Sequence, residues 1–158
     1  MKLINFYSKI IESKKKFNLL DIGNLTLKFW KNGNLWKIGN WENGEPHGEW
    51  KRFHKNGNLE CIGNYKNGKE HGEWKHFYEI GGYLHRIENY VNGKGCGEWK
   101  YFWTNGNFKL IVNYRNGRRH GRWKEFDENG NLSCIGNYKN GILDDEWKWI
   151  DENQFLKR

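Results

Sequence analysis

The stretch HGEWKRFHKNGNLECIGNYKNGKE, residues 47–70, is repeated along the chain, in near-identical form from His71 and in related form from Cys96 and His120. Its tryptophan, Trp50, recurs in steps of 24, 25, 24 and 24 residues, at Trp74, Trp99, Trp123 and Trp147. An earlier copy, FWKNGNLWKIGNWENGEPHG, occupies residues 29–48. A fixed period of this kind indicates a structural unit that needs copies of itself, because neighbouring units bury surface that one unit leaves exposed.

Each repeat contains two Asn-Gly turns or close relatives of them, such as Asn56-Gly57 after the Trp-x-x-Phe run and Asn67-Gly68 after the Asn-Tyr run. Asn-Gly between short aromatic or β-branched runs is a strong hairpin signal, because both residues tolerate positive φ. Each repeat is therefore predicted to be strand, turn, strand, turn. The predicted fold is all-β, a solenoid-like array of antiparallel β-hairpins in one elongated sheet.

Composition agrees with this fold class. Aromatic residues make up 17% of the 158 residues and are accompanied by 20 glycines and a single proline. Aromatic side chains pack well on pleated surfaces, and glycine supplies positive φ in turns. Charged residues make up 29%, so the core is expected to be thin. The formal net charge of +8 permits contact with phosphates or an acidic protein and requires neither.

Residues 1–22 do not fit the repeat, whereas residues 23–158 hold about five and a half copies of 24 residues. Leu3, Phe6, Tyr7, Ile10 and Ile11 fall near helical spacing. We expect a helix, or a helix and a strand, that caps the first edge of the sheet, because an uncovered edge strand invites aggregation. The lysines at 14–16 leave a membrane-surface helix as the alternative.

The three cysteines, Cys61, Cys96 and Cys134, are far apart and form no CxxC pair. This pattern argues against a disulfide framework and suits a reducing compartment. The N-terminus lacks the uninterrupted apolar run of a signal peptide, since Lys9 and Glu12 interrupt it. No stretch is long and apolar enough to span a bilayer. We expect a cytoplasmic protein.

The segments NGKEHGEWKHFYE and NGNLECIGNYKNGKEHGEWK resemble MORN repeats (membrane occupation and recognition nexus) of the variant type common in bacteria, over roughly residues 24–156. The resemblance implies serial β-hairpins in a twisted sheet with a groove, and non-catalytic binding as the usual role. Some bacterial members carry the label of antitoxin in toxin–antitoxin systems. The chain departs from the pattern at Cys96 in place of His, at Arg122 in place of Glu, and at Asp144-Asp145 in place of His-Gly. The last departure predicts a polar end to the array.

Recurring histidines and carboxylates do not predict catalysis. Ligands of one Zn²⁺ each lie about 2.0–2.3 Å from it, whereas equivalent positions two strands apart are about 10 Å apart. This spacing excludes a shared ion for His47, His71, Cys96 and His120, and a paired-carboxylate site for Glu49, Glu73 and Glu98. The glycines serve turns and form no phosphate-binding loop. We expect no enzyme activity, no metal and no cofactor.

Positions that differ between repeats are free to specify a partner. One such position on the Trp-bearing strand holds Tyr101 and another holds Tyr78 and Trp103. Aromatic residues near arginine are typical anchors of protein interfaces, so these three residues are a predicted partner-binding row. The alternative is that they pack within a thin sheet.

A second candidate is the run RNGRRHGRWK, residues 115–124, in which five cations surround one turn. Arg122 reverses the sign of the glutamate found at this position in three other copies. Such a cluster suits carboxylates or phosphates, and a solvated turn is the alternative. The predicted partner-binding cations are Arg115, Arg118, Arg119, Arg122 and Lys124.

The leading functional hypothesis is a non-enzymatic protein-binding module, with a toxin or defence enzyme as the partner and a stoichiometric antitoxin-like, immunity-like or other inhibitor role. The alternative from another class is binding of nucleic acid, or blocking of a nucleic-acid-processing enzyme, through a basic and aromatic surface. A membrane lipid is a less favoured partner, and no small-molecule substrate is expected.

Overall fold

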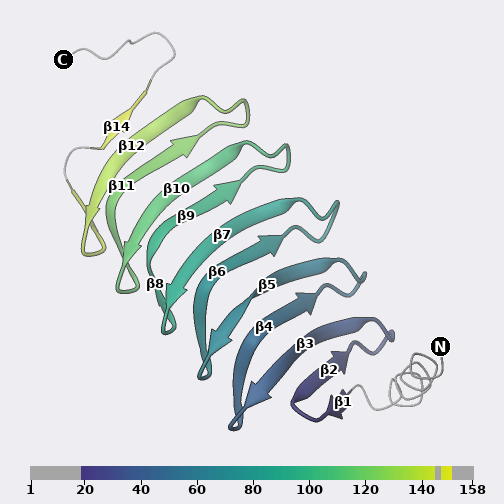
Figure 1. Cartoon of the computed structure of the whole chain (residues 1–158). Coiled ribbons are helices and arrows are strands. Elements are labelled where there is room, and N and C mark those ends of the chain that lie inside the picture. Colours follow the sequence, from purple (N-terminus) through teal and green to yellow (C-terminus); the bar gives the residue numbers. More distant parts are fainter. Residues whose placement is uncertain (1–18, 145–146, 151–158) are drawn as a thin grey trace.

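The computed structural model shows one open, curved and elongated antiparallel sheet (Figure 1). It describes residues 19–144 and 147–150. The helix predicted near the N-terminus falls on residues 1–18 and so lies outside the described residues. The sheet has fourteen strands: β1 (Leu19–Ile22), β2 (Leu25–Phe29), β3 (Leu35–Glu42), β4 (Glu45–Phe53), β5 (Leu59–Lys66), β6 (Lys69–Phe77), β7 (Leu84–Val91), β8 (Lys94–Gly95), β9 (Gly97–Phe102), β10 (Phe108–Arg115), β11 (Arg118–Phe126), β12 (Leu132–Lys139), β13 (Ile142–Leu143) and β14 (Lys148–Trp149).

The strand order follows the chain. β1 to β7 pair in sequence, β9 to β13 continue the series, and the short strands β8 and β14 pair with β7 and β12. Every pair is antiparallel, as in the register of β4 and β5, where Trp50 lies opposite Gly63. The predicted all-β meander of hairpins is therefore confirmed.

The two Asn-Gly turns of each repeat have different backbone conformations. In the turn after Asn-Tyr, both residues have positive φ, with values of 51° for Asn67 and 71° for Gly68. In the turn after Trp-x-x-Phe, only the glycine does, as at Gly57 with φ of 93°. There the asparagine acts through its side chain, since Asn56 Oδ1 accepts a hydrogen bond from the backbone N–H of Asn58 at 2.9 Å. The same dipeptide thus forms two turn types.

The sheet has two chemically different faces. Residues directly opposite one another across a strand pair point to the same face of the sheet. The register therefore places the recurring tryptophans together on one face, which we call the tryptophan face. The opposite face, here called the lysine face, carries a cross-strand row in which lysine alternates with isoleucine. Its members are Ile38, Lys51, Ile62, Lys75, Ile87, Lys100, Ile111, Lys124 and Ile135.

The core lies on the tryptophan face, where indole rings rest on glycines. A Cβ added to Gly63 would lie 2.1 Å from Cδ2 of Trp74, so only glycine leaves room for this ring. Trp74 is 6% exposed, and its indole N–H donates to the carbonyl of Asn64 at 3.2 Å. The ring of Tyr65 fills the space between Trp50 and Trp74. Its centroid lies 5.9 Å from that of the Trp50 ring and 5.1 Å from that of the Trp74 ring. Alternating Trp and Tyr rings thus form a one-layer core.

Candidate binding surfaces

The five predicted cations lie on the hairpin of β10 and β11, but the structure divides them between the two faces. Arg119 lies opposite Tyr114 on the tryptophan face. Its Nη1 donates to the hydroxyl of Tyr138 at 3.1 Å, and its guanidinium lies 5.3 Å from the centre of that ring. The pKa of Arg119 is raised, mainly by its hydrogen bond to the Tyr114 hydroxyl. Arg119 is therefore held by the array.

The other four cations belong to the lysine face by strand alternation. Arg115 and Arg118 are paired directly across the turn Asn116-Gly117, and Arg122 and Lys124 flank Trp123. Arg115, Arg118 and Arg122 are exposed, and Lys124 is partly buried. We call these four residues the cationic hairpin face.

The corresponding lysines in three other repeats are neutralised. Lys51, Lys75 and Lys100 pair with the glutamates two residues before them, at N–O distances of 2.8, 3.2 and 3.1 Å. In β11 that glutamate is replaced by Arg122. Among the residues the structure describes, no member of the cationic hairpin face forms an ion pair. Lys124 therefore lacks, among the described residues, the ion pair that Lys51, Lys75 and Lys100 form.

Two members of the predicted aromatic row form hydrogen bonds to the next repeat. The Tyr78 hydroxyl donates to the carbonyl of Phe102 at 3.0 Å, and the Trp103 indole N–H donates to the carbonyl of Phe126 at 3.1 Å. Trp30 makes the same contact with the carbonyl of Phe53 at 3.0 Å. These side chains join one repeat to the next and so have a scaffold role, whatever else they contact.

Tyr101 lies in β9 on the tryptophan face. It is opposite Arg86 of β7, and its ring centroid lies 6.5 Å from that of His85. Burial raises the pKa of the Tyr101 hydroxyl. The ring centroid of Tyr78 lies 4.4 Å from that of His85, so the histidine connects the two tyrosines.

Sequence reasoning missed a buried polar cluster around Glu88, which is 6% exposed. Its carboxylate lies 3.0 Å from His76 Nε2, and accepts hydrogen bonds from Arg86 Nε at 2.8 Å and from the Tyr90 hydroxyl at 3.0 Å. Burial alone would raise the pKa of Glu88, but the contacts with His76 and Arg86 outweigh it and hold that pKa below its usual value. The sequence carries a signal for it, because Ile87-Glu88-Asn89 stands where three other repeats have Ile-Gly-Asn.

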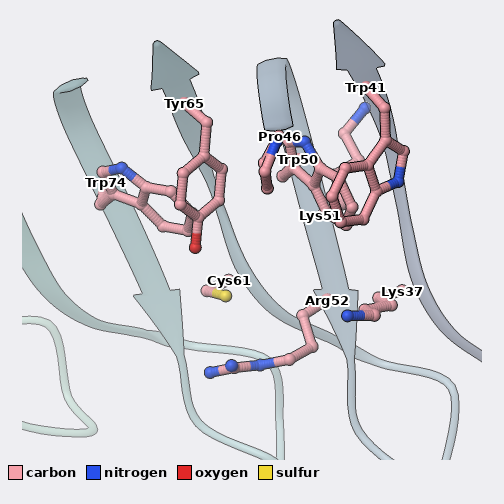
Figure 2. A pocket seen from close by; sticks show the side chains of 9 residues that line it. All are labelled: Lys37, Trp41, Pro46, Trp50, Lys51, Arg52, Cys61, Tyr65 and Trp74. Carbon is pink, nitrogen blue, oxygen red and sulfur yellow. The ribbon is translucent and has the colours of Figure 1, made fainter. Parts of the chain in front are cut away.

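A hollow in the tryptophan face, near the N-terminal end of the array, was also missed. It has a volume of about 140 Å³. Figure 2 shows indole and phenol rings on one side of it and the side chains of Lys37 and Arg52 on the other. No single repeat predicts this hollow, because its walls come from four strands. Its lining residues are Lys37, Trp41, Pro46, Trp50, Lys51, Arg52, Cys61, Tyr65 and Trp74.

Two further observations concern only the described part of the chain. It holds no group of three His, Cys, Asp or Glu side chains placed to bind a metal ion. It also has no helix long and apolar enough to cross a membrane.

Serial hairpins in one open sheet, with contacts from each hairpin to the next, define a β-repeat protein. The family described as MORN repeat variant matches residues 46–67, 96–116 and 119–140. The chain therefore belongs to the MORN repeat variant family, with three matched repeats, and the predicted resemblance is confirmed. The first matched segment contains Trp50 and the turn that follows its strand, and the third contains Trp123 and the turn that follows its strand.

No curated protein shows significant similarity to the chain. Among solved structures, it is similar to a chain in "Crystal structure of GtfA/B complex bound to UDP and GlcNAc", with a TM-score of 0.31 and 11% identity. The match covers 75% of this chain and 23% of that one, so the chain spans about a quarter of the length of its match.

Proposed function

We propose that the protein is a non-enzymatic scaffold of the cytoplasm that binds an acidic surface of a protein partner through its cationic hairpin face. The observation that carries this proposal is the replacement of a recurring glutamate by Arg122, which leaves Lys124 without the ion pair that its equivalents have. The free thiols of Cys61, Cys96 and Cys134 favour a reducing compartment.

Charge of one sign on one hairpin suits a protein surface of opposite charge, because complementary potentials accelerate encounter and set orientation. Exposed arginines also pair bidentately with carboxylates. The finer role that we propose is stoichiometric inhibition of a toxic or defence enzyme, as an antitoxin or immunity protein. It rests on the family's usual binding role and on the absence of a predicted catalytic constellation.

Binding of single-stranded nucleic acid is the second candidate, and the exposed cations are what favour it. The aromatic rings give it less support, since stacking needs free ring faces. Trp50 and Trp74 are 7% and 6% exposed. Lys55 and Lys109 lie over the rings of Trp30 and Trp103, at 5.6 and 4.3 Å from their centres.

The test is co-purification from host cells of wild type and of two double charge reversals. Arg115→Glu with Arg118→Glu alters the cationic hairpin face. Its matched control, Lys66→Glu with Lys69→Glu, makes the same charge change at the equivalent pair across the β5–β6 turn. We expect the first variant to lose a one-to-one protein complex at least tenfold, and the control to keep it. Both should fold, because exposed turn substitutions usually change stability by no more than about 0.5 kcal/mol.

Equal retention of the partner by both variants would refute the proposed surface. Retention of RNA in place of protein, with affinity that falls steeply between low and moderate salt, would favour the nucleic-acid candidate. Flotation with anionic vesicles tests the lipid alternative in the same variants. The inhibitor role requires in addition that the purified partner lose its activity at equimolar protein.

A further inference from the structure

Three cations lie directly opposite one another on adjacent strands of the tryptophan face: Lys28 on β2, Lys37 on β3 and Arg52 on β4. Like charges in this arrangement destabilise a sheet. The same cross-strand row contains no such cluster farther along, where it continues as Cys61, His76, Arg86, Tyr101 and Leu110. This end of the array therefore carries, on its tryptophan face, a repulsion between like charges that the rest of this row lacks.

Among the described residues, only one of these three cations has a carboxylate partner. Arg52 is paired with Glu60, with Nε and Nη2 each 2.8 Å from a carboxylate oxygen. Neither Lys28 nor Lys37 forms an ion pair with a carboxylate of the described residues. The nearby carboxylate of Asp21 accepts a hydrogen bond from the Thr26 hydroxyl. Burial lowers the pKa of Lys37, and repulsion from Lys28 and Arg52 lowers it further.

Two of these cations, Lys37 and Arg52, border the hollow of about 140 Å³ described above, and Lys28 lies next to it as the cross-strand neighbour of Lys37. Lys37 and Arg52 face it from one side, and the rings of Trp41, Trp50 and Tyr65 form much of its opposite side (Figure 2). The hollow is too small for a folded partner and has apolar walls beside the ammonium of Lys37 and the guanidinium of Arg52. Its chemistry therefore suits a small ligand with a flat apolar body and an anionic group.

We propose that this hollow binds a small phosphate monoester, with its phosphate on Lys37 and Arg52, beside Lys28, and its planar ring against the Trp and Tyr side chains. Lys28 and Lys37, which form no ion pair among the described residues, supply two positive charges. These match the charge of about −1.5 to −2 that a phosphate monoester carries at pH 7, whereas a carboxylate supplies only one negative charge. The site binds a ligand and performs no reaction. It lies on the face opposite the cationic hairpin face and does not depend on the function proposed for that surface.

The experiment is a titration of the full chain with phenyl phosphate, inorganic phosphate and benzoate at constant ionic strength, followed by calorimetry and by the NMR shift of the Trp50 indole N–H. Phenyl phosphate should bind most tightly, inorganic phosphate more weakly and benzoate weakest. The variant Lys28→Gln with Lys37→Gln should lose affinity by at least about tenfold, because it removes two positive charges from the place where the phosphate binds. Its matched control is Lys75→Gln with Lys100→Gln, which removes the same charge from the lysine face and should bind like wild type.

Thermal unfolding provides a second readout. It compares the single variant Lys28→Gln with wild type, in the absence and in the presence of phenyl phosphate. Lys28→Gln alone should raise the Tm of the ligand-free protein, because it relieves repulsion, while lowering the Tm increase that phenyl phosphate causes in wild type. Equal shifts in the double variant and its control would overturn the proposal, as would benzoate binding as tightly as phenyl phosphate. Binding to phosphate-bearing vesicles without binding to the soluble ester would likewise overturn it and identify a lipid surface instead.

Discussion

At the scale of single residues, a glycine before the Asn-Tyr run gives the tryptophan of the next strand room to pack. Gly39 and Gly63 lie beneath Trp50 and Trp74, and both indole N–H groups find a carbonyl acceptor. In the fourth of the aligned repeats this position is Val112, and Trp123 lies instead against Gly136, whose added Cβ would meet Trp123 Nε1 at 2.5 Å. The buried Trp123 Nε1 has no acceptor within the described residues. One side chain thus changes the packing of its neighbour.

The first prediction concerns this glycine contact. Gly63→Ala should lower the free energy of unfolding by about 1–3 kcal/mol or more, because the new methyl group has no room beside Trp74. Denaturant unfolding measures the loss. On a Trp74→Leu background, where the ring is gone, the same change should cost much less. An equal cost on both backgrounds would contradict the packing described here.

Glu88 gives a pH dependence. Its pKa in the folded protein lies below the ordinary value of 4.5, so its stabilisation is present at neutral pH and is lost as the pH falls through the folded pKa. Glu88→Gln should therefore cost about 1.5–3 kcal/mol at pH 7, and the difference from wild type should shrink in acid. Thermal unfolding from pH 7 to pH 3 measures this. Glu73→Gln, at an exposed ion pair with Lys75, is the control and should change little at any pH.

At the scale of elements, hydrogen bonds from one turn to the next repeat hold the hairpins in register. Asn56 Nδ2 and Asn58 Nδ2 both donate to the carbonyl of Glu79 at 3.0 Å. Asn105 and Asn107 repeat this arrangement with Glu128, at 2.6 and 2.8 Å. The Asn-Gly-Asn sequence therefore shapes its own turn and also connects it to the next one.

This connection between repeats can be tested by removing a single oxygen atom, the hydroxyl of Tyr78. Tyr78→Phe removes the hydroxyl that donates to the Phe102 carbonyl, and should lower stability by about 0.5–1.5 kcal/mol. Hydrogen exchange should accelerate in β6, β7 and β9 before the rest of the sheet. The matched control is Tyr83→Phe, since Tyr83 is 57% exposed and its hydroxyl has no hydrogen-bond partner among the described residues. Identical effects of both changes would rule out a specific role for the Tyr78 contact.

At the scale of the whole molecule, an array in which each hairpin pairs with the next should tolerate loss of a complete repeat. Deletion of residues 47–70 joins Pro46 to His71 and restores the native order Pro-His-Gly-Glu-Trp. We expect the shortened chain to keep its β-structure by circular dichroism and to unfold cooperatively at a lower Tm. Deletion of residues 59–70 alone, which removes a single strand-and-turn unit, should abolish folding because the next strand would run in the wrong direction. Comparable folding of both deletions would contradict the sheet order.

The sequence by itself determined the features that depend on local spacing. A period near 24 residues with two turns per repeat defines the number and direction of the strands, and Asn-Gly defines where they reverse. The sign change at Arg122 is also visible without a structure. Strand alternation already separates Arg119 from Arg118 and Arg122, although five cations around one turn look like one patch in linear sequence.

The tertiary structure decided everything that depends on which side chains meet across strands. Tyr78 and Trp103 differ in sequence, yet both bond to a carbonyl of the next repeat, so variation at this position does not mark it as free for a partner. The hollow at Trp50 and the row of Lys28, Lys37 and Arg52 combine residues from separate hairpins. Such contacts depend on strand register, bulges and the direction of each ring, which tertiary packing sets and local sequence patterns do not specify.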